Sequence, residues 1–285
     1  MTHEQRDPLR AGAVVTGAGR GLGREIARVL HERRLTVHAT DLDAEAVSET
    51  ARLLGPPAWS SALDVRDPEA CRAAAAAAAR RAGSLAVWVN NAGVLLTGPA
   101  WEQDEAARRL MLEVNAVGTI NGTLAALEHM CPADAGHVVN VISLAGLVTA
   151  PGETVYAASK HAALAFSLGT LSDLRRAAIR GVHISCVCPD GLWTPMLHDK
   201  LDDPEAALSF SGRVLMPDRV AADVARLLDR PRPVTTIPRW RGVMARAFDL
   251  SPRLAVRSTG LVVRVGRLKQ RRLARRIAAG RWPPS

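Results

Sequence analysis

The chain has 285 residues, 48% of them hydrophobic, and its mean hydropathy is +0.03. This balance is typical of a globular protein and argues against a disordered or membrane-spanning chain. The net charge of +9 is unevenly placed, since 13 of the 37 basic residues but only one of the 28 acidic residues lie from Arg239 onward. A mildly acidic body is therefore followed by a strongly basic tail.

The amino-terminal segment is polar and shows no signal-peptide pattern, and no apolar run approaches the ~18 residues of a spanning helix. We therefore expect a cytoplasmic protein. The four cysteines include no C-x-x-C pair, so reduced core cysteines are favoured over a metal or redox site.

Short apolar runs alternate with longer segments of helical periodicity along the body of the chain. Strands are predicted at 11–16, 35–40, 59–65, 85–89, 137–142 and 182–187, and a last one at 234–237. Helices are predicted at 21–34, 43–54, 68–82, 102–130 and 156–178. This alternation predicts an α/β fold with a doubly wound parallel sheet of the Rossmann type. We expect one domain over 1–238 and a basic, helical extension over 239–285.

A glycine-rich turn, T-G-A-G-R-G-L-G, joins the first strand to the first helix. Glycines allow a diphosphate to approach the backbone, and the free N–H groups at the start of a helix attract it. Asp41 follows the second strand, about 20 residues further on, where a carboxylate can accept both ribose hydroxyls of NAD. Its charge disfavours the 2′-phosphate of NADP, whereas Arg20 in the turn would attract that phosphate, so NAD is favoured and NADP stays open.

Tyr156 and Lys160 open a predicted helix with a spacing of four, which places both on one helix face. A nearby ammonium stabilises a phenolate and lowers its pKa, as a proton donor and acceptor at neutral pH requires. Ser143 follows the fifth strand, and Asn91 follows the fourth. The carboxyl ends of parallel strands share one edge, so these side chains are expected to meet there.

With these motifs in order along 10–230, the sequence resembles the short-chain dehydrogenase/reductase family. The resemblance implies an oxidoreductase that moves a hydride between a nicotinamide cofactor and a secondary alcohol or ketone. It also implies that Tyr156 transfers the proton, Lys160 lowers its pKa and binds the ribose, and Ser143 holds the substrate oxygen. Asn115, in the helix after the fourth strand, would hold a water through its backbone. The implied cofactor contacts are Gly17, Arg20, Gly21, Leu22, Gly23, Asp41, Asp64, Val65, Asn91, Ala92, Gly93, Tyr156, Lys160, Pro189, Gly191, Leu192 and Thr194.

The sequence departs from the family pattern at one place. Asp190 stands where the family has a glycine after the sixth strand, which leaves the shape of this loop open. Residues 192–217 then form the segment that covers the substrate in the family, and their apolar side chains fit either a hydrophobic substrate or ordinary packing. The family usually forms homodimers or homotetramers, which is carried over as an expectation.

The basic tail leaves several interpretations open. Arg264, Arg267, Arg271 and Arg275 would form one stripe on a helix, with Leu261 and Leu268 largely on other faces. A peripheral contact with an anionic membrane, packing on a partner subunit and simple solvation all fit, while nucleic-acid binding is less favoured because the tail lacks a known motif. Two rival functions also remain, namely an NADP-dependent ketone reductase and a non-catalytic NAD-binding protein that works through its tail.

Overall fold

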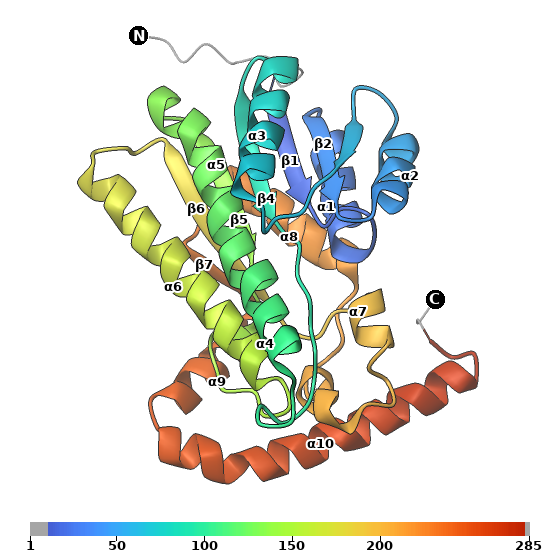
Figure 1. Cartoon of the computed structure of the whole chain (residues 1–285). Coiled ribbons are helices and arrows are strands. Elements are labelled where there is room, and N and C mark those ends of the chain that lie inside the picture. The colour runs from blue at the N-terminus through green and yellow to red at the C-terminus, as the bar shows by residue number, and fades with distance from the viewer. Residues whose placement is uncertain (1–10, 283–285) are drawn as a thin grey trace.

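Seven parallel strands form the central sheet, in the spatial order β3-β2-β1-β4-β5-β6-β7 (Figure 1). The computed structural model describes residues 11–282. The strands are β1 (Gly12–Thr16), β2 (Thr36–Asp41), β3 (Trp59–Ala62), β4 (Leu85–Asn90), β5 (Gly136–Val141), β6 (Val182–Pro189) and β7 (Val234–Ile237). The chain runs outward from β1 to β3 and then returns to β4 beside β1. Ligands of such sheets bind at this reversal, beyond the carboxyl ends of the strands.

Helices cover both faces of the sheet, as the buried apolar residues on both sides of its central strands require. The helices are α1 (Gly21–Glu32), α2 (Ala44–Leu54), α3 (Pro68–Ala82), α4 (Glu105–Leu112), α5 (Gly118–Ala133), α6 (Thr154–Arg176), α7 (Pro195–His198), α8 (Pro217–Asp229), α9 (Arg239–Asp249) and α10 (Pro252–Ala278). One core lies between the sheet and α1, α2 and α8, and the other between the sheet and α3, α5 and α6. The predicted doubly wound fold is confirmed.

The predicted helix over 102–130 consists of α4 and α5 joined by one π-helical turn, Glu113–Val117. Such a turn interrupts the regular hydrogen-bond ladder and is frequent at functional sites. Among the residues that the structure describes, Glu105–Ala133 is the one helix long and apolar enough to cross a membrane. However, 56% of its most apolar window is buried inside the protein. It therefore fits the core helix that it forms here.

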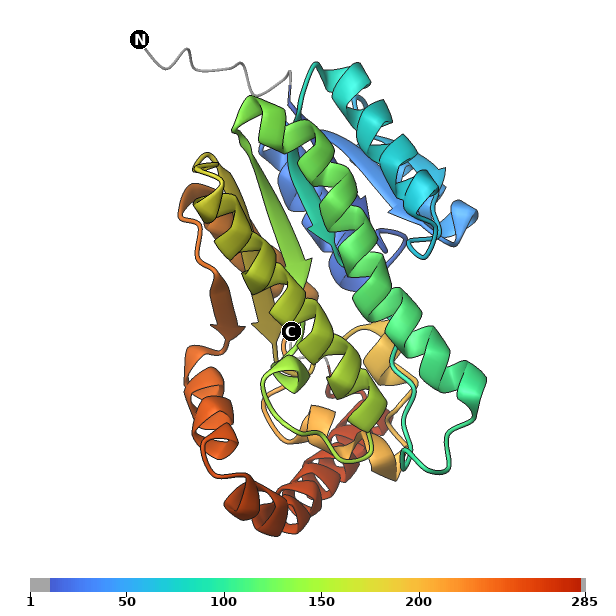
Figure 2. The same ribbon diagram turned by 60° about the vertical axis from the view of Figure 1, so that its left-hand side comes forward.

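The basic tail forms two helices that lie across the carboxyl end of the sheet (Figure 2). The inner face of α10 packs on the segment that follows β6, and Leu273 joins Leu197 and Phe210 in a small buried cluster. Gln270 is buried and donates hydrogen bonds to the carbonyls of Lys200 and Asp203. The tail is thus helical, as predicted, and it is fastened to the substrate-covering segment.

Candidate active site

One cavity of about 830 Å³ opens at the carboxyl ends of the strands. Every residue predicted to contact a cofactor lines it, from Gly17 in the glycine turn to Thr194 after β6. Ser143, Tyr156 and Lys160 line it as well, whereas Asn115 is fully buried outside the lining. The topology therefore gathers residues from six strand ends, β1 to β6, into a single space.

The glycine turn at one end of the cavity can accept a diphosphate. Gly17 has φ +63°, and a Cβ there would lie 2.8 Å from the Cα of Ala92. A Cβ on Gly23 would lie 2.0 Å from the carbonyl oxygen of Gly17. Helix α1 begins here with no side-chain cap and no acidic residue in its first turn. Its first N–H groups thus keep the capacity to bind an anion, and the residues fit a dinucleotide.

Two carboxylates lie near this turn in different environments. Asp41 accepts hydrogen bonds from the backbone N–H of Gly19 at 2.8 Å and of Asp43 at 3.1 Å, so the end of β2 holds the turn in place. Asp64, after β3, forms an ion pair with Arg66 at 2.6 Å, and hydrogen bonding to this guanidinium lowers the pKa of Asp64. Asp41, like the neighbouring helix cap Asp43, forms no ion pair among the described residues.

Asn91 connects the turn to β4. Its side-chain amide donates to the carbonyls of Thr16 and Gly17, both at 3.0 Å, and the Thr16 hydroxyl accepts the backbone N–H of Asn91 and Ala92. The Asn91 side chain therefore shapes the cofactor turn, and only its remaining surface faces the cavity.

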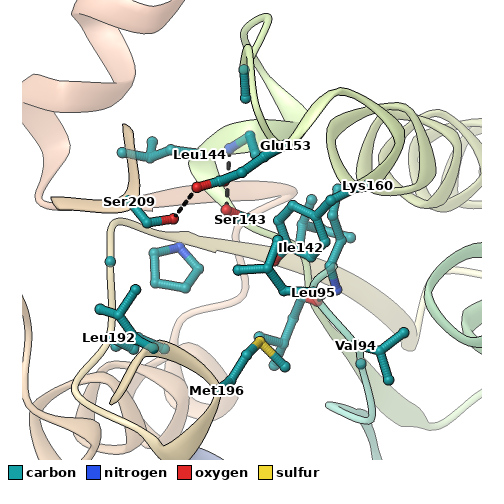
Figure 3. Close-up of a pocket in the computed structure, with 18 of the residues that line it drawn as sticks. Val94, Leu95, Ile142, Ser143, Leu144, Glu153, Lys160, Leu192, Met196 and Ser209 are labelled. Atoms are coloured by element: carbon teal, nitrogen blue, oxygen red, sulfur yellow. Dashed lines mark hydrogen bonds between the residues drawn. The ribbon is translucent and has the colours of Figure 1, made fainter. Parts of the chain in front are cut away.

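Ser143 and Lys160 line the part of the cavity drawn in Figure 3, and Tyr156 lines the same cavity. Lys160 is buried, donates to the carbonyl of Val141 at 2.9 Å, and lies 5.8 Å from the centre of the Tyr156 ring. Ser143 caps the short turn after β5, where its hydroxyl accepts the N–H of Ala145 at 3.1 Å. The predicted juxtaposition on α6 and at the end of β5 is present.

The electrostatics of this group differ from the expectation. Burial raises the pKa of Tyr156 above its usual range, the charge of Glu153 adds to this, and hydrogen bonding to Ser143 opposes it. Burial also lowers the pKa of Lys160 to about 8. Burial therefore outweighs the hydrogen bond to Ser143, and the expected lowering of the Tyr156 pKa by Lys160 is not found.

Asn115 occupies the π-helical turn and connects two elements of the site. Its side chain donates to Val94 and to the hydroxyl of Ser159, and its Oδ1 accepts the N–H of Val94 at 2.9 Å. Its carbonyl accepts the Thr119 hydroxyl at 2.8 Å. A Cβ on Gly93 would lie 3.1 Å from Asn115 Oδ1 and 3.6 Å from Lys160 Nζ, so Asn115 and Lys160 flank the same point of the chain.

The structure adds a polar pair that the sequence did not indicate. Glu153 is buried at the start of α6, lines the cavity, and accepts a hydrogen bond from the Ser209 hydroxyl at 2.7 Å (Figure 3). Burial raises the pKa of Glu153 to about 7. In the sequence, the only sign that Glu153 belongs to the site is that it precedes Tyr156 by three residues. This spacing is too common to identify a functional acid.

The loop after β6 is fixed by the tail. Asp190 is buried and pairs with Arg241 of α9 at 2.9 Å, and Arg241 also donates to the Ser211 hydroxyl. Burial raises the pKa of Asp190, although the charge of Arg241 opposes this. The acid at the family's glycine position thus joins the cavity loop to the extension, and Met244, Phe248 and Val262 of α9 and α10 complete the cavity wall.

Comparison with known proteins agrees with this geometry. The family model described as short chain dehydrogenase matches residues 11–205. The 2-(R)-hydroxypropyl-CoM dehydrogenase of Xanthobacter autotrophicus is 35% identical over 229 residues, covering 76% of this chain and 88% of its own. SadH of Mycobacterium tuberculosis is 30% identical over 264 residues, covering 89% of this chain and 94% of its own. A match over 89% of the chain cannot end before residue 239, so it includes part of the basic extension.

Two solved structures share the fold. Levodione reductase superposes with a TM-score of 0.72 at 26% identity, covering 81% of this chain and 97% of its own. A short-chain dehydrogenase/reductase from Burkholderia phymatum in complex with NAD gives 0.73 at 26% identity, covering 87% and 94%. Each match therefore covers more than four fifths of this chain.

Proposed function

Since this chain belongs to the short-chain dehydrogenase family and is an oxidoreductase of that family, we propose that it exchanges a hydride between NAD and a largely apolar secondary alcohol or ketone. One observation carries this proposal: a single cavity is lined both by an uncapped helix start with the carboxylate of Asp41 and by Tyr156, Lys160 and Ser143. A dinucleotide bound at the helix start would extend toward Tyr156.

Each residue of the catalytic group has a definite task in this proposal. Tyr156 gives its phenol proton to the carbonyl oxygen during reduction, or takes it from the alcohol during oxidation. Ser143 binds the same oxygen and orients it, and Lys160 supplies positive charge behind the phenol. Asn115 acts as a positioning residue, because its bonds to Val94 and Ser159 hold the loop after β4 against α6. The bound cofactor supplies or accepts the hydride.

The preference for NAD rests on charge. Asp41 lies at the end of β2 and lines the cavity beside the turn, where a ribose with free hydroxyls would donate to its oxygens. A 2′-phosphate at that position would meet a carboxylate of the same sign. Arg20 also lines the cavity and is exposed, so it is the residue that would favour NADP.

The apolar character of the substrate follows from the cavity wall beyond Tyr156. The wall is built mainly of apolar side chains from the segments after β4, β5 and β6 and from the two tail helices. They include Leu95, Leu96, Leu144, Met196, Leu208, Phe248 and Val262. Glu153 with Ser209 is one polar pair in this wall, and it provides a place for a hydroxyl or second carbonyl of the substrate.

Cofactor binding is the first test. NADH and NADPH are titrated by nicotinamide fluorescence against the wild type and Asp41→Ala. We expect tighter NADH binding by the wild type, and an NADPH affinity that rises at least about tenfold in the variant because a like charge is removed. Oxidation of hydrophobic secondary alcohols with NAD is then measured. A wild-type preference for NADPH would overturn the cofactor assignment, and binding without turnover of any alcohol or ketone would favour a non-catalytic protein.

A further inference from the structure

The outer side of α9 and α10 carries a concentration of exposed apolar side chains. Of the sixteen large apolar side chains that are exposed in the described chain, nine belong to this short segment. Met244 also lines the cavity, and we name the other eight the outer tail face: Trp240, Val243, Leu250, Leu254, Val256, Leu261, Val265 and Leu268. Leu250 is 89% exposed and Leu261 is 66% exposed, so no segment within residues 11–282 covers this face.

The same face is strongly basic. Helix α10 contains nine arginines and lysines and no acidic residue. Of these, Arg267 pairs with Glu205 and Lys269 donates to the carbonyl of Ser211, while the exposed Arg264 and Arg271 form no ion pair within residues 11–282. At 100° per residue, Leu261 and Leu268 lie next to Arg257, Arg264 and Arg271 and point outward with them. The sequence predicts that Leu261 and Leu268 lie largely on other faces than the arginine stripe. In the structure they lie beside it on the same outer side.

We propose that the outer tail face docks on an anionic lipid bilayer. An anionic bilayer can bind the apolar and the basic side chains of this face at the same time. The leucines and the tryptophan would enter the interface between headgroups and acyl chains, while the arginines contact the lipid phosphates. A second copy of this chain would bring two arrays of unpaired arginines together. A nucleic acid would use the arginines and leave the apolar side chains in water.

The inner sides of the same helices strengthen the proposal. Met244, Phe248, Ala255 and Val262 line the substrate cavity from α9 and α10. Docking through the outer side would therefore bring one wall of this cavity onto the lipid surface. The tail is also held rigidly, since Arg241 is fixed by Asp190 and Gln270 is bound to two carbonyls, so the apolar residues are presented in a constant arrangement.

Vesicle flotation with the full chain tests this inference without reference to turnover. Binding is measured to phosphatidylcholine vesicles, with and without phosphatidylglycerol, at low and high salt. We expect binding to the anionic vesicles that weakens with salt. Leu261→Glu with Leu268→Glu, and separately Arg264→Gln with Arg271→Gln, should each reduce binding about tenfold or more.

Matched controls keep the result interpretable. Leu53→Glu on α2 and Arg80→Gln on α3 change similarly exposed side chains elsewhere and should leave binding unchanged. Thermal unfolding confirms that every variant is folded. The proposal is overturned if anionic vesicles are not bound, or if the tail variants bind as the wild type does. If vesicles are not bound and the tail variants abolish dimerisation or duplex DNA binding, the proposal is also overturned, because the face then binds a second copy or a nucleic acid.

Discussion

Replacing Arg241 with methionine removes the cation that connects the tail to the loop after β6. The Asp190 side chain is 5% exposed and that of Arg241 is 19% exposed, so the pair is largely shielded from water. Removing one partner of a buried pair costs roughly 3–5 kcal/mol, because the remaining charge is left uncompensated. Water reaches part of Arg241, and we therefore expect a loss of about 3 kcal/mol in the free energy of unfolding.

Urea unfolding of the ligand-free protein measures this loss. Asp190→Asn combined with Arg241→Met removes both charges and keeps an acceptor for the N–H of Gly191, which Asp190 Oδ1 binds at 3.1 Å. The double variant should regain most of the stability. Arg33→Met breaks the exposed pair of Arg33 with Asp229 and serves as the control, with an expected cost below about 1 kcal/mol.

The double variant decides whether the reasoning is correct. If Arg241→Met is as stable as the control, the pair contributes no more than a surface contact. If the double variant is as unstable as the single one, the cost comes from lost packing of the guanidinium and not from the unpaired carboxylate. Since Gly191 and Leu192 line the cavity, a loosened loop should also raise KM more than it lowers kcat.

Three further outcomes follow from the buried groups of the site. Tyr156→Phe should reduce kcat/KM by about 10²- to 10⁴-fold, with NADH affinity retained in a fluorescence titration. Burial raises the pKa of Glu153 from 4.5 to about 7. The contribution of this group to the free energy of unfolding is therefore complete below about pH 4.5 and is lost as the pH rises through about 7, and the total loss is up to about 3 kcal/mol. Glu153→Gln should remove this loss in urea unfolding at about pH 5 and pH 8. Tyr156 is the single tyrosine of the chain, so ultraviolet absorbance should show no tyrosinate below about pH 10 while the ligand-free protein stays folded.

The sheet and the position of the site could be predicted because both depend on local patterns. Apolar runs such as 137–142 mark strands that are buried on both faces, and helices between them require a parallel sheet. Once the sheet is parallel, Ser143 and Asn91 must lie at one edge, since each follows a strand. The spacing of Tyr156 and Lys160 needs only the geometry of a helix. None of these inferences requires knowledge of a distant contact.

The remaining features depend on contacts between residues far apart in the sequence. Glu153 meets Ser209 across 56 residues, and Asp190 meets Arg241 across 51. No local periodicity encodes such pairs, and each acid read alone suggests a solvated turn. The tail shows the same limit, because Val262 and Leu261 are adjacent apolar residues, yet one lines the cavity and the other is exposed. Only the packing of α10 on the covering segment decides which side faces inward.

The order in which Lys160 and Tyr156 lose their protons links the geometry to the chemistry. The Lys160 nitrogen lies 5.8 Å from the centre of the Tyr156 ring, and a charged Lys160 at this position would stabilise a phenolate. Burial lowers the pKa of Lys160 to about 8 and raises that of Tyr156, so the lysine becomes neutral first. With a pKa of about 8, Lys160 stays mostly charged at pH 7, and the carbonyl of Val141 accepts one of its N–H groups at 2.9 Å. A proton transfer that depends on this charge should therefore weaken as the pH rises through about 8.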